Sequence, residues 1–182
     1  GPTELEGDGV YWQDGFSKDE ASQLHRFVSL GFKISSSDAT KKYLKVNFPK
    51  EKIFEPGTAI MVESFKSSLK TFLNIIGTDY SKINVLVYTC EKPIKETGLS
   101  TELELSSLRA AIVAQVIAEM QEIDHEKIIP VGYGRYYAGV EDINVSKKEL
   151  VELNIYNLWG SKVLQVDDLD GVEVSEETGT KP

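Results

Sequence analysis

The chain has 182 residues but only one cysteine and two histidines. A single cysteine, Cys90, excludes an internal disulfide framework. The cysteine and the two histidines lie far apart in the sequence, so they do not form the cluster that a metal site needs. Gly132-Tyr133-Gly134 is too short for a nucleotide-binding fingerprint. We therefore expect neither a metal nor another cofactor. No run approaches the roughly 18 apolar residues that a membrane-spanning helix needs.

Basic residues are also in the minority. The chain has 20 lysines and arginines against 29 acids, and its formal net charge is −9. This balance argues against a nucleic-acid partner and against basic-patch binding to an anionic membrane. The acids gather at the end, where residues 167–182 hold six acids and one base and so contribute −5 of the −9.

The sequence divides into three expected segments. Residues 1–38 form an N-terminal extension with one short helix, which Ser17 and Glu20 would cap. Residues 39–168 form the main domain, and residues 169–182 form an acidic tail that we expect to be disordered. Gly1-Pro2 resembles the remnant of a tag-removing protease site, so we expect the native start, with any signal peptide or lipid anchor, to be missing.

Residues 100–120 carry the strongest helical pattern. Ser100 or Thr101 can cap this helix, and Glu104 stands at capping-box spacing from Thr101. Small residues favour close packing of the helix, and an apolar stripe predicts its buried face. The small residues are Ala110, Ala111 and Ala114, and the stripe comprises Leu105, Leu108, Ile112, Val116 and Met120. Two further helices are predicted, one over residues 58–76 that ends at Gly77, and one through Leu150, Leu153 and Tyr156.

Four strands are predicted, over residues 43–48, 83–88, 127–133 and 161–166. The second is mostly apolar and is expected to be buried on both faces. Pro130 gives the third an edge or irregular position, and the serine-rich residues 35–38 are expected to form a loop. Because strands and long helices alternate, the sequence predicts an α/β fold with helices packed on one mixed β-sheet.

Arg109 is out of keeping with a plain core helix. It lies in the first turns, where a cation gains nothing from the positive end of the helix dipole. It is either a solvated surface arginine, which is the more frequent case, or a residue that joins the free N–H groups of the first turn in holding an anion.

Cys90 follows a predicted buried strand, which is a suitable position for a thiol nucleophile if a base lies nearby. Only His25 and His125 are available as imidazole bases, and neither lies in a recognisable motif. A buried, unreactive thiol is the simpler interpretation.

Four stretches carry a resemblance when they are taken in order. They are Phe48 with Phe54-Glu55-Pro56-Gly57, then Ile83 to Thr89, then Leu105-Ser106-Ser107-Leu108-Arg109-Ala110, and then Ile129 to Gly134. Over about residues 42–168, this order and spacing resemble the OmpA C-terminal-like family of peptidoglycan-binding domains. The resemblance implies a two-layer sandwich whose pocket binds the diaminopimelate side chain of the peptidoglycan stem peptide. It implies that Arg109 pairs with the ligand carboxylate, a geometry that suits a guanidinium.

The resemblance also implies that Thr89, Cys90, Glu102 and Ser106 lie at the ligand pocket. Four of the family's positions are changed here. Cys90 replaces the aspartate that holds the ligand's ammonium, Glu102 replaces an asparagine, and Leu158-Trp159 replace two arginines after Asn157. The loop from Cys90 to Arg109 is also longer than usual. Glu91 or Glu96 is a candidate substitute for the missing carboxylate.

Two functions remain open from these observations. The first is a non-catalytic module that anchors an envelope or secretion complex to peptidoglycan, lipid-anchored on the periplasmic side of a bacterial outer membrane. The second is a structural subunit of a secretion machine that keeps the fold, has lost the ligand and contacts other proteins. An exposed patch of Tyr136, Tyr137 and Trp159 would favour the second. A thiol enzyme built on Cys90 is a third and less favoured hypothesis.

Overall fold

The computed structural model describes residues 4–5, 22, 26, 33–36, 43–48, 52–136 and 150–159. The expected strand at 161–166, the acidic tail and nearly all of the N-terminal helix lie outside these residues. The chain divides into two compact units. The first comprises Gly1–Pro49, Ile75–Ile83 and Leu153–Pro182, and the second comprises Lys50–Asn74 and Asn84–Glu152.

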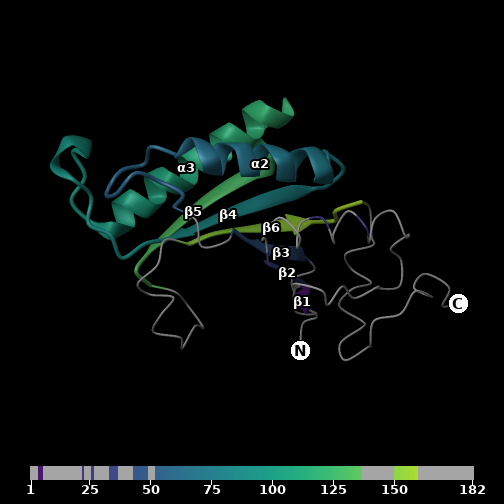
Figure 1. Cartoon of the computed structure of the whole chain (residues 1–182), viewed down its shortest axis with the longest axis horizontal. Helices are drawn as coiled ribbons and strands as arrows, with labels where there is room; N and C mark the ends of the chain where they lie inside the picture. Colours follow the sequence, from purple (N-terminus) through teal and green to yellow (C-terminus); the bar gives the residue numbers. More distant parts are fainter. Residues whose placement is uncertain are drawn as a thin grey trace, which may run out of the picture. The chain divides into compact units, whose positions relative to one another are not determined.

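Six strands form the sheet (Figure 1). They are β1 (Glu4–Leu5), β2 (Lys33–Ser36), β3 (Tyr43–Asn47), β4 (Lys82–Tyr88), β5 (Ile128–Gly134) and β6 (Leu150–Tyr156), in the order β1-β2-β3-β6-β4-β5. β2 pairs antiparallel with both β1 and β3. The prediction that Pro130 lies in an edge strand is confirmed, because β5 ends the order.

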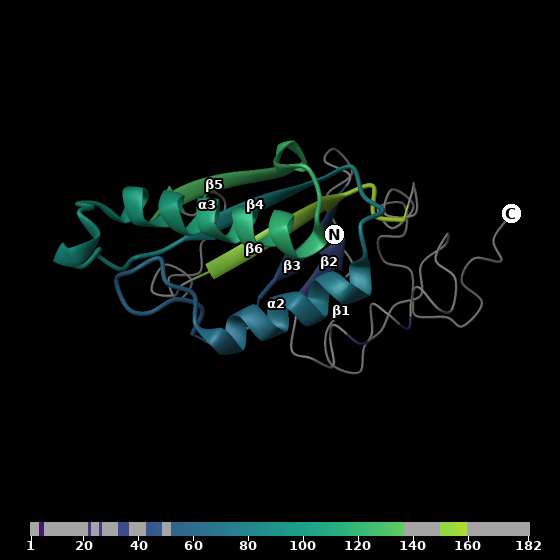
Figure 2. The same ribbon diagram turned by 90° about the horizontal axis from the view of Figure 1, so that it is seen from above.

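The second unit carries the helices α2 (Glu63–Ile76) and α3 (Glu102–Gln121), apart from the last two residues of α2. Both lie on the same side of β4 and β5 (Figures 1 and 2), and α3 packs on β5. The predicted α/β class, with helices on one mixed sheet, is therefore confirmed. Two short 3-10 turns, η1 (Lys95–Thr97) and η2 (His125–Lys127), flank α3. No helix among the described residues is both long and apolar enough to span a membrane.

The C-terminal prediction of a helix through Leu150, Leu153 and Tyr156 was wrong, because these residues form β6. Val151, Leu153 and Ile155 alternate along the strand, and all three are fully buried. The strand pairs with β3 and β4, which are remote in sequence, so its structure is set by non-local pairing rather than by local propensity. The predicted regular alternation of strands and helices was wrong for the same reason.

Three other local predictions need correction. Ser35 and Ser36 lie in β2 rather than in a loop, opposite Lys45 and Leu44 of β3. The helix predicted from residue 58 begins only at Glu63, because Phe54 and Met61 pair across a turn that contains Gly57. β4 was predicted to be buried on both faces. Its residues are instead mostly buried and half-buried in alternation, so only one face is fully buried.

The predicted cap of α3 is confirmed. Thr101 and Glu104 form a reciprocal capping box. The predicted stripe, however, is not the buried face: Leu108 and Met120 are 39% and 38% exposed. The buried face comprises Leu105, Ser106, Arg109, Ala110, Val113, Ala114, Ile117 and Ala118.

Close approach to β5 selects this face of α3. A Cβ atom added to Gly132 would lie 2.3 Å from the backbone nitrogen of Ser107. The backbone of α3 at Ser107 therefore lies too close to Gly132 of β5 for a side chain to fit between them.

Candidate functional site

Arg109 is fully buried in the second turn of α3, so the interpretation as a solvated surface arginine was wrong. Its guanidinium lies over the ring of Phe54, with 4.7 Å between its central carbon and the ring centroid. Burying a charge in this way is tolerable only when it is paired and hydrogen-bonded. The partners of Arg109 therefore define the candidate site.

Three nitrogens of Arg109 donate to three residues in two segments of the second unit. Nε donates to the carbonyl oxygen of Thr58 at 2.7 Å, and one terminal nitrogen donates to Thr89 Oγ1 at 3.2 Å. The other terminal nitrogen donates to Glu91 Oε2 at 2.7 Å and forms an ion pair with it. The guanidinium thus ties α3 to the turn before α2 and to the loop after β4.

Glu91 is the exposed partner of this pair. Its side chain is 37% exposed, whereas that of Arg109 is 0% exposed. Glu91 Oε2 also accepts a hydrogen bond from the backbone nitrogen of Gly57 at 2.9 Å. A guanidinium and a backbone N–H group therefore converge on one carboxylate oxygen, which is the arrangement of a carboxylate-binding site. The chain's own Glu91 occupies it.

Gly57 is fixed by this contact and by the loop that follows β4. Its φ is +66°, and an added Cβ would lie 2.7 Å from Ile94 Cγ2 and 2.9 Å from the carbonyl oxygen of Lys92. The carbonyl oxygen of Gly57 accepts from the backbone nitrogen of Ile94 at 2.9 Å. Only glycine suits this conformation and this close approach.

Two of the predicted site residues hold the framework around Arg109. Thr89 is 1% exposed, its backbone nitrogen donates to the carbonyl oxygen of Gly134, and its hydroxyl accepts from the backbone nitrogen of Glu91 at 3.0 Å. Ser106 is fully buried, and its hydroxyl accepts from the backbone nitrogen of Gly134 at 2.7 Å. These bonds position the end of β4 and the start of α3 against the end of β5.

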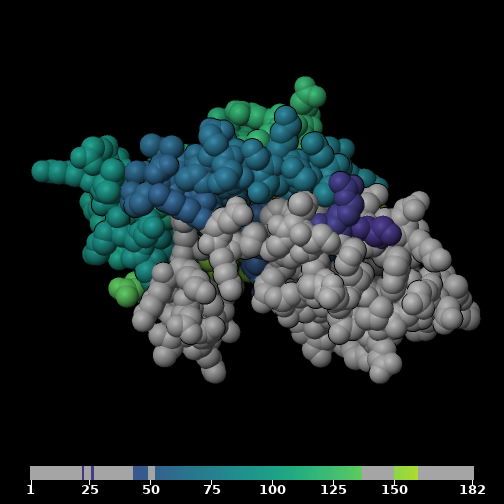
Figure 3. Space-filling model, in the orientation of Figure 1, coloured from purple at the N-terminus to yellow at the C-terminus, as the bar shows by residue number. Residues whose placement is uncertain are grey.

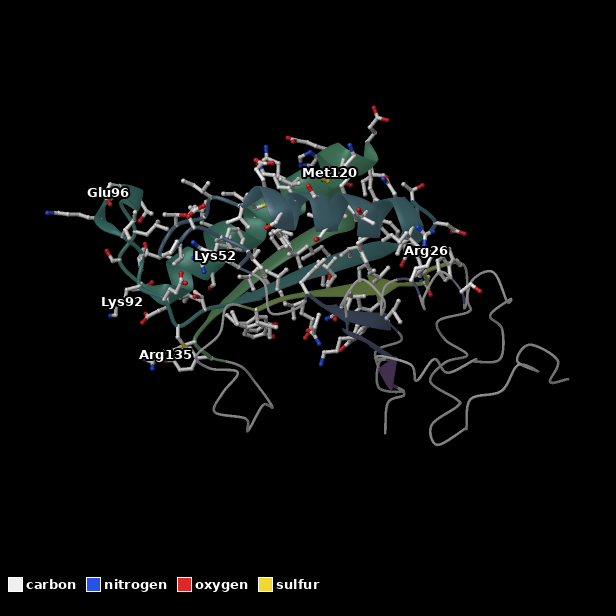
Figure 4. All side chains as sticks on the ribbon, viewed as in Figure 1. Arg26, Lys52, Lys92, Glu96, Met120 and Arg135 are labelled. Carbon is white, nitrogen blue, oxygen red and sulfur yellow. The ribbon has the colours of Figure 1, made fainter. Side chains whose placement is uncertain are left out.

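The remaining predicted residues lie nearer the surface. Glu102 begins α3, is 16% exposed and pairs with Lys92 at 3.9 Å. Glu96 lies on η1, in the loop that projects at one end of the second unit (Figures 3 and 4). Of the two candidate substitute carboxylates, the structure thus brings Glu91, and not Glu96, to Arg109.

Cys90 lies between Thr89 and Glu91 and is half-buried rather than buried as predicted. The proposed base His125 lies in η2, beyond the far end of α3. A helix of 20 residues is about 30 Å long, so His125 cannot serve Cys90. The other base, His25, lies outside the described residues. Within the part of the chain that the structure describes, no three histidine, cysteine or acidic side chains gather as metal ligands.

Of the three aromatic residues considered as an exposed patch, the structure describes Tyr136 and Trp159, and they belong to different units. Tyr136 is 75% exposed in the second unit. In the first unit, Trp159 follows buried Leu158, and its ring nitrogen donates to the carbonyl oxygen of Ile76 at the end of α2. Tyr137 lies outside the described residues.

Two contributors to the site were missed in the sequence: the carbonyl oxygen of Thr58 and the backbone nitrogen of Gly57. Backbone groups carry no residue-type signal. The only available sign was Pro56-Gly57, which is typical of a turn and could have indicated a backbone bent towards another segment.

Several solved structures have a similar fold. The periplasmic domain of Helicobacter pylori MotB (residues 90–256) superposes with a TM-score of 0.57 at 17% identity, over 85% of this chain and 86% of that chain. The cell wall anchor of the T6SS from Pseudomonas aeruginosa gives 0.55 at 15% identity, over 75% and 95%. An outer membrane protein from Borrelia burgdorferi gives 0.51 at 16% identity, over 70% and 98%.

At these identities the likeness establishes the fold alone, which is the predicted α/β sandwich with helices on one mixed sheet. No protein-family model matches the sequence. No curated protein matches it either.

Proposed function

We propose that the chain is a non-catalytic cell-envelope module that anchors an envelope or secretion complex to peptidoglycan. The observation that carries this proposal is the buried guanidinium of Arg109, which converges with the backbone N–H of Gly57 on a carboxylate. Such a pair of donors can hold the free carboxylate of a diaminopimelate side chain. The fold shared with the cell wall anchor of the T6SS supports the proposal.

In this proposal the ligand carboxylate takes the place of the Glu91 carboxylate. The carbonyl oxygen of Thr58 and the hydroxyl of Thr89 keep the guanidinium aligned, and Ser106 keeps the start of α3 against β5. We assign the ligand's ammonium to Glu102, whose carboxylate already pairs with the ammonium group of Lys92 at 3.9 Å. Exchange of one carboxylate for another leaves the buried charge compensated, so it avoids the cost of an unpaired Arg109.

The experiment is co-sedimentation of the purified protein with diaminopimelate-type sacculi. Arg109→Met removes the donors but keeps much of the side-chain volume. Arg135→Met is the matched control, because Arg135 is an exposed arginine of the same unit. We expect saturable binding by the parent and by Arg135→Met, and at least tenfold weaker binding by folded Arg109→Met. Equal binding by all three proteins would show that Arg109 takes no part in binding to sacculi.

A second candidate function is the structural subunit that has lost the ligand. It is favoured by the internal acceptors that Arg109 already has, and by exposed apolar side chains of the same unit. These are Ile60, Leu103 and Tyr136, at 63%, 52% and 75% exposure. An outer-membrane lipoprotein of a type IVB (Dot/Icm) secretion system would fit either function and a periplasmic location. Failure of the parent protein to sediment with sacculi would favour this second function.

A further inference from the structure

We infer that Glu91 is an internal competitor for the carboxylate site of Arg109, and that it sets the affinity of the site for an external carboxylate. This inference rests on the proposed function, since it concerns the same ligand class. It concerns Glu91, which follows Cys90. The sequence resemblance suggested Glu91 only as a partner for the ligand's ammonium group.

The geometry makes the competition direct. Glu91 Oε2 takes both donors at once, the terminal nitrogen of Arg109 at 2.7 Å and the backbone nitrogen of Gly57 at 2.9 Å. A second carboxylate cannot use these donors until Glu91 leaves them. Binding of an external carboxylate and the internal ion pair are therefore mutually exclusive at this oxygen position.

The structure also shows which partner can leave. Arg109 has no exposed surface and is held by Thr58 and Thr89, whereas the Glu91 side chain is 37% exposed. The backbone of Glu91 is held separately, through the bond from its nitrogen to Thr89 Oγ1. Rotation of the Glu91 side chain into solvent would thus open the donors without moving the loop or α3.

The cost of displacing Glu91 lowers the apparent affinity for a ligand. When only a fraction of molecules have the site open, the apparent dissociation constant rises by the inverse of that fraction. A charge-assisted hydrogen bond to a half-exposed carboxylate corresponds to a factor of about 3 to 30. Removing the competitor should therefore tighten binding by this factor.

The test compares Glu91→Gln with the parent in sacculus co-sedimentation and in titration with free meso-diaminopimelate. Glu91→Gln removes the charge and keeps the shape. Glu126→Gln is the control, because it makes the same charge change at an exposed position beyond the far end of α3. It therefore corrects for weaker repulsion between an acidic protein and an anionic ligand. We expect about 3- to 30-fold tighter binding by Glu91→Gln and no change in Glu126→Gln.

The outcomes separate the two proposals. If the parent binds and Arg109→Met does not, but Glu91→Gln binds no more tightly than the parent, the function stands and the competitor role is wrong. If neither the parent nor Glu91→Gln binds, both proposals are wrong. A second measurement needs no variant: saturating meso-diaminopimelate should shift the side-chain carboxyl ¹³C signal of Glu91 to that of a solvated glutamate. An unchanged signal in the bound protein would overturn the inference.

Discussion

The Arg109–Glu91 pair should be measurable as a coupling free energy in a double-mutant cycle. The perturbations are Arg109→Met, Glu91→Ala and the two combined. Glu91→Ala leaves a fully buried cation without its counter-charge, and it also leaves the Gly57 N–H without its acceptor. Because Glu91 is half-exposed, we expect this variant to lose about 2 kcal/mol of unfolding free energy.

Arg109→Met should cost a similar amount. The methionine fills much of the vacated volume, and the half-exposed Glu91 carboxylate can return to water. The lost bonds to Thr58 and Thr89 still destabilise the protein, so we expect a loss of about 2–3 kcal/mol.

The coupling follows from the distance and the exposure of the pair. Two unit charges about 4 Å apart attract by about 4 kcal/mol at an effective dielectric constant of about 20. Solvent reaches Glu91, which is 37% exposed, and screening reduces this value to about 2 kcal/mol. The double variant should therefore lose about 2–3 kcal/mol, which is less than the combined losses of the two single variants.

Urea unfolding of the four proteins at neutral pH gives the cycle. Met120→Ala serves as a control, since this side chain is 38% exposed on the same helix, and it should add to Glu91→Ala without coupling. A coupling below about 0.5 kcal/mol between Arg109 and Glu91 would refute the ion pair as the organising contact of the site.

Three further predictions concern the framework of the fold. Thr101→Ala should cost about 1 kcal/mol in urea unfolding because Thr101 caps α3, whereas Ser100→Ala should have less than half that effect. Gly132→Ala should lower the thermal midpoint far more than Gly98→Ala, because a Cβ at Gly132 would lie 2.3 Å from backbone, whereas one at Gly98 meets nothing within 4 Å and adds only the strain of a φ of +76°; equal losses would contradict the packing of α3 on β5. Burial raises the pKa of Tyr80 from 10.0 to about 12, so the folded chain keeps this proton longer than the unfolded chain. The contribution of Tyr80 to the unfolding free energy should be fully present below pH 10 and fall by up to about 2–3 kcal/mol as the pH rises to 12. A pH series of urea midpoints should lack this fall in Tyr80→Phe.

The sequence predicted the elements whose signals are local. The capping box at Thr101, the stop at Gly77 and the edge position of Pro130 each depend on neighbouring residues, and each was confirmed. β6 was missed because its residues fit a helical spacing as well as an alternating one, and only pairing with β3 and β4 decides between them.

The candidate site could be predicted only in part. Arg109 was found through a motif, but its burial depends on the face that α3 turns to the sheet, and Gly132 sets that face. The sequence indicated Glu91 as a carboxylate near the site. Its pairing with Arg109 could not be predicted, because Glu91 Oε2 also accepts from the backbone nitrogen of Gly57, which is remote in sequence.

The most direct test of the account is competition on sacculi. The parent protein is bound to diaminopimelate-type sacculi, and free meso-diaminopimelate is added in increasing amounts, with lysine as the control because it lacks the second carboxylate. We predict that meso-diaminopimelate releases the protein, that lysine does not, and that Glu91→Gln needs proportionally less meso-diaminopimelate for release. Sacculus binding that meso-diaminopimelate leaves unchanged would show that Arg109 is not the ligand site, and no sacculus binding at all would contradict the proposed function.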